Sequence, residues 1–148
     1  MKGEFFMPAN NNQRITGETP FKPEYDEFIR EYRGRGSLKV QTSVAQDAFP
    51  IEDVFVDVAL IYKGNRYSIY HDVTDSSGIV NEIVLPSRLT EETQTPESAE
   101  KGEPVYLVSA FHPGFEEIID CPVTIHDRIE TILPISLNPT NGNTEDAV

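Results

Sequence analysis

The stretch Val54–Thr74, VFVDVALIYKGNRYSIYHDVT, carries two apolar runs separated by a short polar segment. Every second position from 54 to 60 is Val or Leu, which is the period of a strand with one buried face. Residues 67–74 are rich in the aromatic and β-branched side chains that strands favour. Lys63–Arg66, between the two runs, has the composition of a turn. The stretch therefore predicts two neighbouring strands joined by a tight connection.

Short apolar segments with the same period lie on both sides of this stretch. Turn-forming residues separate them at intervals of about 8–12 residues, with no helical pattern between them. The predicted strands cover residues 37–44, 50–62, 67–74, 79–85, 105–111, 115–119, 123–125 and 129–137. We therefore predict a mainly β fold, a seven- to eight-stranded antiparallel β-sandwich in which each strand buries one face.

One helix is predicted before the strands. An apolar stripe recurs there at helical spacing and consists of Tyr25, Phe28, Ile29 and Tyr32. A helix of about ten residues is marginal alone in water, so the stripe must pack against the following domain or against a partner. The expected organisation is a flexible N-terminal lead-in (1–20), the amphipathic helix (21–35), the β-sandwich domain (36–139) and a C-terminal tail (140–148).

The chain is strongly acidic and its charge is unevenly distributed. It has 148 residues, with 12 Lys and Arg against 25 Asp and Glu, for a formal net charge of −13. This balance argues against binding to nucleic acid, where cations must neutralise phosphates, and against anionic membrane surfaces. Residues 1–35, here called the N-terminal arm, sum to zero, whereas 36–139 sum to −11. The arginines at the end of this arm, Arg30, Arg33 and Arg35, suit either of two roles. They are compatible with contact to an acidic body, its own or a neighbour's, or simply with the last turn of a helix, where cations favour the macrodipole.

Four segments are similar to a known group of domains: Gly36–Thr42, Ala48–Val56, Val73–Pro86 and Val108–Phe115. They resemble carboxypeptidase regulatory-like domains, which are relatives of the transthyretin (prealbumin) sandwich and of Cna B-type modules. The resemblance covers about residues 36–139 and is greatest to small forms from clostridia and related Firmicutes, some of which accompany spore-cortex or peptidoglycan-related proteins. It implies a bacterial structural or binding module without catalytic activity.

The sequence provides no catalytic constellation, and we predict neither a cofactor nor a metal site. His71, His112 and His126 fall on different predicted elements, so no metal-ligand spacing exists among them. Tyr32-Arg33-Gly34 resembles part of the Tyr-Arg-Gly-Ser motif of transthyretin-like hydrolases, but it stands before the domain instead of at its end.

The resemblance to Cna B-type modules also raises the question of an internal lysine–asparagine isopeptide bond. Lys39 and Asn138 lie in approximately the first and last strands. If the alternate apolar residues of those strands face inward, both of these side chains face outward, which opposes the bond.

We therefore expect a non-enzymatic β-sandwich used in assembly or protein–protein recognition, through a protein partner or self-association by the N-terminal arm. The candidate contact residues are Tyr25, Phe28, Ile29, Tyr32, Phe55 and Ile61. The alternatives are a carbohydrate- or peptidoglycan-binding accessory module and, third, a hydrolase of the transthyretin-like class. We expect no nucleic acid and no membrane insertion. The sequence has no readable secretory signal, so it is compatible with a cytoplasmic protein or with release by another route, as in a spore.

Overall fold

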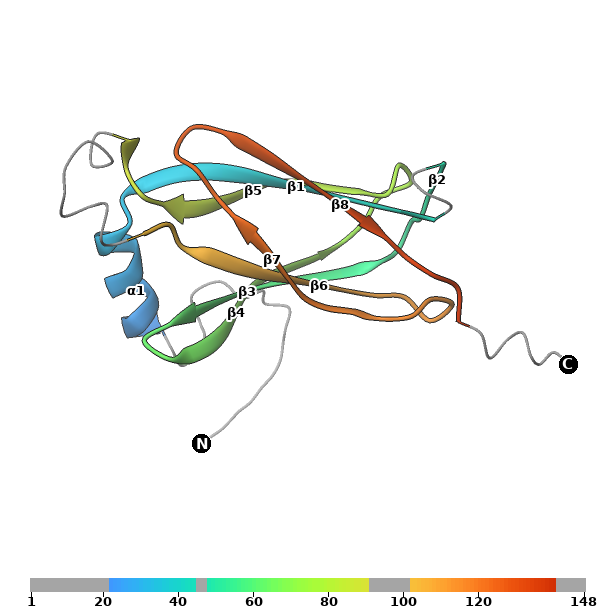
Figure 1. The fold of residues 1–148 in the computed structure, drawn as a ribbon, viewed down its shortest axis with the longest axis horizontal. Coiled ribbons are helices and arrows are strands. Elements are labelled where there is room, and N and C mark those ends of the chain that lie inside the picture. Colours follow the sequence, from blue (N-terminus) through green and yellow to red (C-terminus); the bar gives the residue numbers. More distant parts are fainter. Residues whose placement is uncertain (1–21, 45–47, 91–101, 141–148) are drawn as a thin grey trace, which may run out of the picture.

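The computed structural model describes residues 22–44, 48–90 and 102–140 and shows one helix and eight strands in these ranges (Figure 1). In chain order they are α1 (Lys22–Glu31), β1 (Gly34–Val44), β2 (Phe49–Pro50), β3 (Phe55–Tyr62), β4 (Asn65–Val73), β5 (Ile79–Ser87), β6 (Val105–Phe111), β7 (Ile118–Thr124) and β8 (Glu130–Ser136).

The strands form two sheets that face each other. In the first sheet, β1 pairs with β2 and β5 on antiparallel ladders and with β8 on a parallel one. The second sheet has the order β4-β3-β6-β7 and is antiparallel throughout. Figure 1 shows the two layers stacked, with α1 at one end of the sandwich and β2 at the other. The predicted β-sandwich with one short N-terminal helix is confirmed.

The core lies between the sheets and comes from alternate positions of each strand. Val56, Val58 and Leu60 of β3 point inward and are fully buried, as the period of that stretch predicts. Leu38 and Val40 of β1 meet them from the opposite sheet. On the outer side of β3, Phe55 and Ile61 are 40% and 50% exposed.

Three details differ from the expected strands. The first and last strands, β1 and β8, run parallel. The sequence did not predict this direction, because the side-chain period is the same for parallel and antiparallel strands. Residues 115–119 and 123–125, predicted as separate short strands, are replaced by the single strand β7, which runs through Pro122 at an edge. Strand β5 continues past Pro86, because β5 is also an edge strand and edge strands tolerate proline.

Helix α1 packs across the end of the sandwich that contains the β3–β4 turn. Phe28 is 2% exposed, and its ring meets Tyr62 edge-on at a centroid distance of 5.2 Å. The Tyr62 hydroxyl donates to Glu31 at 2.9 Å, and Lys63 pairs with Glu27 at 2.7 Å. Burial and the Glu31 carboxylate raise the pKa of Tyr62. Within the described ranges, no helix is long and apolar enough to cross a bilayer.

Every edge strand among the described residues contains a proline or a bulge. Pro86, Pro122 and Pro134 lie within β5, β7 and β8, and each removes a backbone donor. Strand β4 has no proline, but an extra residue at Ile69 shifts its register against β3 and forms a bulge. Prolines and bulges discourage edge-to-edge pairing with another chain. These features make the edges less suited to pairing with a strand of another chain.

Candidate binding groove

A groove of about 450 Å3 opens at the end of the sandwich opposite α1. It lies between the beginning of β3, the end of β6 and the turn that joins β6 to β7. Its lining residues are aromatic or acidic apart from one proline: Asp53, Phe55, Phe111, His112, Pro113, Phe115 and Glu117. The groove therefore combines an apolar floor with ionisable groups at its rim.

The aromatic floor follows from the strand register. Phe55 of β3 stands directly opposite Phe111 of β6, with ring centroids 6.1 Å apart. His71 of β4 packs against the other side of Phe55 at 5.4 Å. His112 and Phe115 form a second pair, edge-on at 5.3 Å. The first two pairs are tilted and the third is edge-on, so all three avoid face-to-face stacking and form a preformed aromatic surface.

The turn that forms one wall of the groove is held in place by backbone hydrogen bonds. Phe115 N–H donates to the His112 carbonyl at 3.0 Å, and Glu116 N–H donates to the Asn138 carbonyl at 2.8 Å. The Gly114 N–H donates to Nδ1 of His112 at 3.2 Å, which identifies that nitrogen as an acceptor. The position of His112 in the groove is thus set by its own turn.

The two carboxylates that line the groove are exposed and come from different segments of the chain. Asp53 precedes β3 with a φ of 64°, a left-handed conformation that Asp tolerates better than most residues. Its N–H donates to the carbonyl of Thr74 at 3.0 Å, so its backbone is anchored. Glu117 lies just before β7. An aromatic floor between two carboxylates is suited to a ligand that carries both apolar surface and positive charge.

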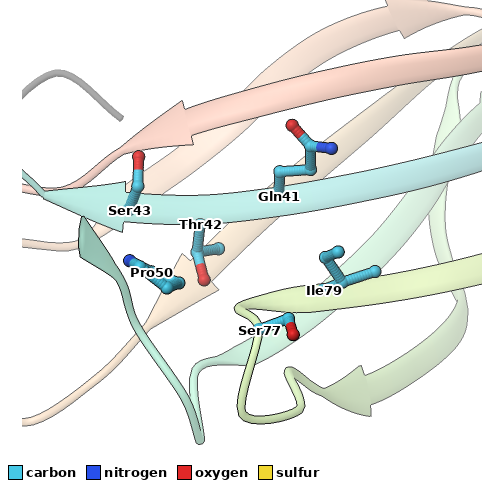
Figure 2. Close-up of a pocket in the computed structure, with 6 residues that line it drawn as sticks. All are labelled: Gln41, Thr42, Ser43, Pro50, Ser77 and Ile79. Atoms are coloured by element: carbon cyan, nitrogen blue, oxygen red, sulfur yellow. The ribbon is translucent and has the colours of Figure 1, made fainter. Parts of the chain in front are cut away.

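A second hollow, of about 310 Å3, lies at the same end of the molecule and is shown in Figure 2. Its six lining residues contain no ionisable side chain: Gln41, Thr42, Ser43, Pro50, Ser77 and Ile79. The Thr42 hydroxyl is engaged in the fold, because it donates to the Ile51 carbonyl at 2.9 Å. The backbone N–H of Thr42 likewise donates to Gly78 at 2.8 Å. This hollow marks the place where β1, β2 and the β4–β5 turn are joined.

A cluster of charged residues lies at the α1 end. Oε2 of Glu103 forms an ion pair with the Arg88 guanidinium at 3.4 Å, and Nδ1 of His126 lies 3.7 Å from the same oxygen. Burial raises the pKa of the nearby Tyr32, and Glu31 and Glu103 raise it further, whereas Arg88 lowers it. Glu103 belongs to a stretch that reads as a solvated loop in the sequence, and residues 91–101 of that stretch lie outside the described residues.

The predicted contact residues divide between two places. Of the helical stripe, Phe28 is in the core of this chain, and Tyr25 and Tyr32 pack partly buried against that core. Ile29 is half-buried. Phe55 contributes to the groove floor, while Ile61 is exposed nearer to α1 on the same outer face. A role of these six residues in contacts with a partner stays a prediction.

The remaining chemical candidates are separated by the fold. His71 and His112 flank the groove, whereas His126 is beside Glu103 at the other end. Among the described residues, no three His, Cys, Asp or Glu side chains are grouped to hold a metal. Lys39 is in register with Ile132, so Asn138 is six residues, or about 20 Å, further along the chain. That separation adds to the parity argument against an isopeptide bond between Lys39 and Asn138.

No protein family description matches this sequence, and neither does any curated protein. Solved structures show similar folds at low identity. A streptococcal ancillary pilin has a TM-score of 0.50 and 11% identity, over 94% of this chain and 37% of the pilin. The minor pilin of Streptococcus agalactiae has a TM-score of 0.45 and 13% identity, over 72% of this chain and 45% of that one. The 3-chlorocatechol 1,2-dioxygenase of Rhodococcus opacus has a TM-score of 0.49 and 10% identity, over 72% of this chain and 60% of the dioxygenase.

The chain spans between 37% and 60% of the lengths of these three structures. The likeness to the ancillary pilin shows a shared β-sandwich fold, in agreement with the class that the sequence resemblance implied. Because the identity is 11%, the likeness extends to the fold alone.

Six of the seven groove residues were absent from the predicted contact surface: Asp53, Phe111, His112, Pro113, Phe115 and Glu117. The sequence did contain a signal for an aromatic side chain beside other apolar ones at Phe111, because the alternation of 105–111 places it on the same face as Val105 and Leu107. The pairing of Phe55 with Phe111 depends on β3 lying beside β6, which no local pattern encodes.

Proposed function

We propose that this chain is a non-catalytic structural module that acts in assembly by binding other proteins, including further copies of itself. The observation that carries the proposal is the set of exposed apolar side chains on the second sheet. The described residues include nine exposed large hydrophobic side chains, and five of them lie on strands of this sheet: Phe55, Ile61, Val73, Val105 and Ile119. Exposed apolar side chains gathered on one sheet, on both sides of the Arg66–Asp120 ion pair, favour a protein interface.

Two further features support an interface over an active site. Each edge strand contains a proline or a bulge, which favours the faces over the edges as docking surfaces. The groove at the end of the apolar face has rings and carboxylates but no nucleophile positioned by a base. A role in a bacterial cell-wall or spore system is part of the same proposal and rests on the sequence resemblance.

The test is light scattering after size exclusion on the full chain over a wide concentration range. We expect oligomers that Ile61→Glu with Val105→Glu dissociates, because two charges would then have to be desolvated in the interface. Val84→Glu with Ile132→Glu is the matched control, since both residues are exposed on the first sheet. A monomer at every concentration, or equal dissociation by both pairs, would contradict assembly through this face.

Glycan binding is the second candidate, because ring faces beside carboxylates also suit sugars. Phe55 and Phe111 would form the platform, and Asp53 and Glu117 would accept hydroxyl hydrogen bonds. Retention on purified cell-wall material, lost in Phe55→Ala, would support this candidate. No retention by the unmodified chain would eliminate it.

A further inference from the structure

The charge of the sandwich is segregated between its two ends. At the groove end, residues 48–56, 71–79 and 110–119 contain no Lys or Arg. They contain six carboxylates: Glu52, Asp53, Asp72, Asp75, Glu116 and Glu117. The half nearer α1, residues 22–36, 61–67, 82–90, 102–106 and 124–131, has eight Lys and Arg and eight Asp and Glu. The acidity of the described body is therefore concentrated around the groove and is not spread evenly.

A salt bridge marks the boundary between the two ends on the outer face. The guanidinium of Arg66, on β4, reaches Asp120 of β7 at 2.6 Å and so neutralises that carboxylate. Asp120 is held further by its N–H, which donates to the Ser109 hydroxyl at 3.0 Å. Beyond this bridge, Asp53 and Glu117 line the groove, and neither forms an ion pair with another described residue.

We propose that the groove binds a polypeptide segment that carries lysine or arginine side chains. The proposal rests on the proposed function and names the kind of partner that the recognition surface accepts. The rings of Phe55 and Phe111 offer faces for a cation, and Asp53 and Glu117 provide its counter-charges. A neutral or acidic partner would leave these carboxylates facing apolar or like-charged surface.

The surroundings of the groove favour a peptide over a small free cation. Exposed Val73 is paired with Phe55 across the β3–β4 ladder, and Ile119 is exposed at the beginning of β7. The apolar surface therefore continues away from the cation site, with room for the residues that flank a basic side chain. Such flanking contacts are absent for a lone ammonium or guanidinium compound.

The experiment titrates the isotopically labelled full chain with a short acetylated peptide in which arginine alternates with glycine, and follows backbone amide shifts. We expect shifts concentrated at residues 53–55 and 111–117 and an affinity that weakens with salt. Asp53→Asn with Glu117→Gln should weaken binding about 5- to 10-fold, as expected for two exposed ion pairs. Phe55→Leu keeps apolar bulk but removes the ring, and should weaken binding about 3-fold.

Glu24→Gln with Glu130→Gln is the matched control, because it makes the same change in net charge at the other end. A general attraction of an acidic protein for cations would affect both pairs equally, and that result would overturn the proposal. Shifts spread over the whole surface would also overturn it, as would equal affinity for acetylarginine amide. If light scattering still detects face-dependent oligomers in that case, the assembly function stands and only the basic partner is lost.

Discussion

At the scale of single residues, the turn between β4 and β5 is the clearest case of a local sequence that dictates its own geometry. Asp75 accepts hydrogen bonds from the N–H groups of Ser77 and Ile79 at 2.9 and 3.0 Å. Gly78 has a φ of 75°, and its N–H donates to the Asp75 carbonyl. The motif Thr74–Gly78 is thus explained by turn chemistry, without a ligand.

Gly78 also permits close packing, because a Cβ at this position would lie 2.5 Å from the carbonyl oxygen of Thr42. We predict that Gly78→Ala lowers the free energy of unfolding by more than 2 kcal/mol, roughly the left-handed penalty plus the clash. Gly64→Ala is the control, because Gly64 also has a positive φ, 83°, but a Cβ added there would meet no other atom within 4 Å. Urea denaturation should show that Gly64→Ala lowers the free energy of unfolding by only about 1 kcal/mol. Equal losses would show that the contact with Thr42 is unimportant.

Asp127 is a second residue with a defined structural role. Backbone N–H groups of Thr90 and Arg35 each donate to its carboxylate at 3.0 Å, and the Thr90 hydroxyl donates at 2.8 Å. These hydrogen bonds, the backbone bond from Thr90 first, hold the pKa of Asp127 below its ordinary value of 3.8. The carboxylate therefore joins the segment after β5 to the beginning of β1.

Because the pKa of Asp127 is depressed by folding, its stabilising effect is fully present above about pH 4. It is lost as the pH falls through the folded-state pKa. We predict that Asp127→Asn lowers the free energy of unfolding by about 2 kcal/mol at pH 7. The difference from the unmodified chain should shrink toward pH 2. Denaturation of both proteins at pH 7 and at pH 2 measures this difference in the free energy of unfolding. Glu130→Gln is the surface control. A difference that does not change with pH would contradict this role of the Asp127 charge.

At the scale of elements, helix α1 is bound to the sandwich through Phe28. The ring contacts Tyr32 at 4.9 Å and Tyr62 at 5.2 Å, and lies 6.4 Å from Tyr106. The Tyr106 hydroxyl in turn donates to the Pro86 carbonyl at 2.6 Å, which connects the helix contact to both sheets. Burial raises the pKa of Tyr106, so it remains a hydrogen-bond donor.

We predict that Phe28→Ala lowers the free energy of unfolding by about 3–5 kcal/mol, the range for emptying an aromatic site in a core. Arg30→Ala on the exposed side of the same helix should change it by less than about 0.5 kcal/mol. Calorimetry on Phe28→Ala and Arg30→Ala measures the two changes in the free energy of unfolding. A loss below 1 kcal/mol for Phe28→Ala would mean that the helix detaches readily.

The element scale also shows how far sequence reasoning extends. Alternation predicted the buried faces of β1 and β3, since burial itself selects those side chains. It failed at β7, where Pro122 suggested a break that an edge strand tolerates. It was silent on the parallel β1–β8 pair and on β3 lying beside β6. The groove floor depends on that second pairing, so from the sequence only Phe55 was predicted as a candidate contact among its lining residues.

At the scale of the whole molecule, the N-terminal arm divides into two parts with different expected roles. Helix α1 contributes Phe28 to the core, whereas residues 1–21 lie outside the described residues. Removing the entire arm would therefore combine loss of stability with any loss of assembly. Two truncations separate the effects: one that begins at Lys22 and one that begins at Gly34.

The truncation at Gly34 should lower the melting temperature by more than about 10 °C, because it removes at least the 3–5 kcal/mol attributed to Phe28, at roughly 3 °C per kcal/mol. The truncation at Lys22 should leave the melting temperature of the monomer unchanged within about 2 °C, since the described core remains complete. Light scattering on this stable truncation then reports assembly alone. Lost oligomers would assign self-association to residues 1–21, and retained oligomers would assign it to the outer face of the second sheet.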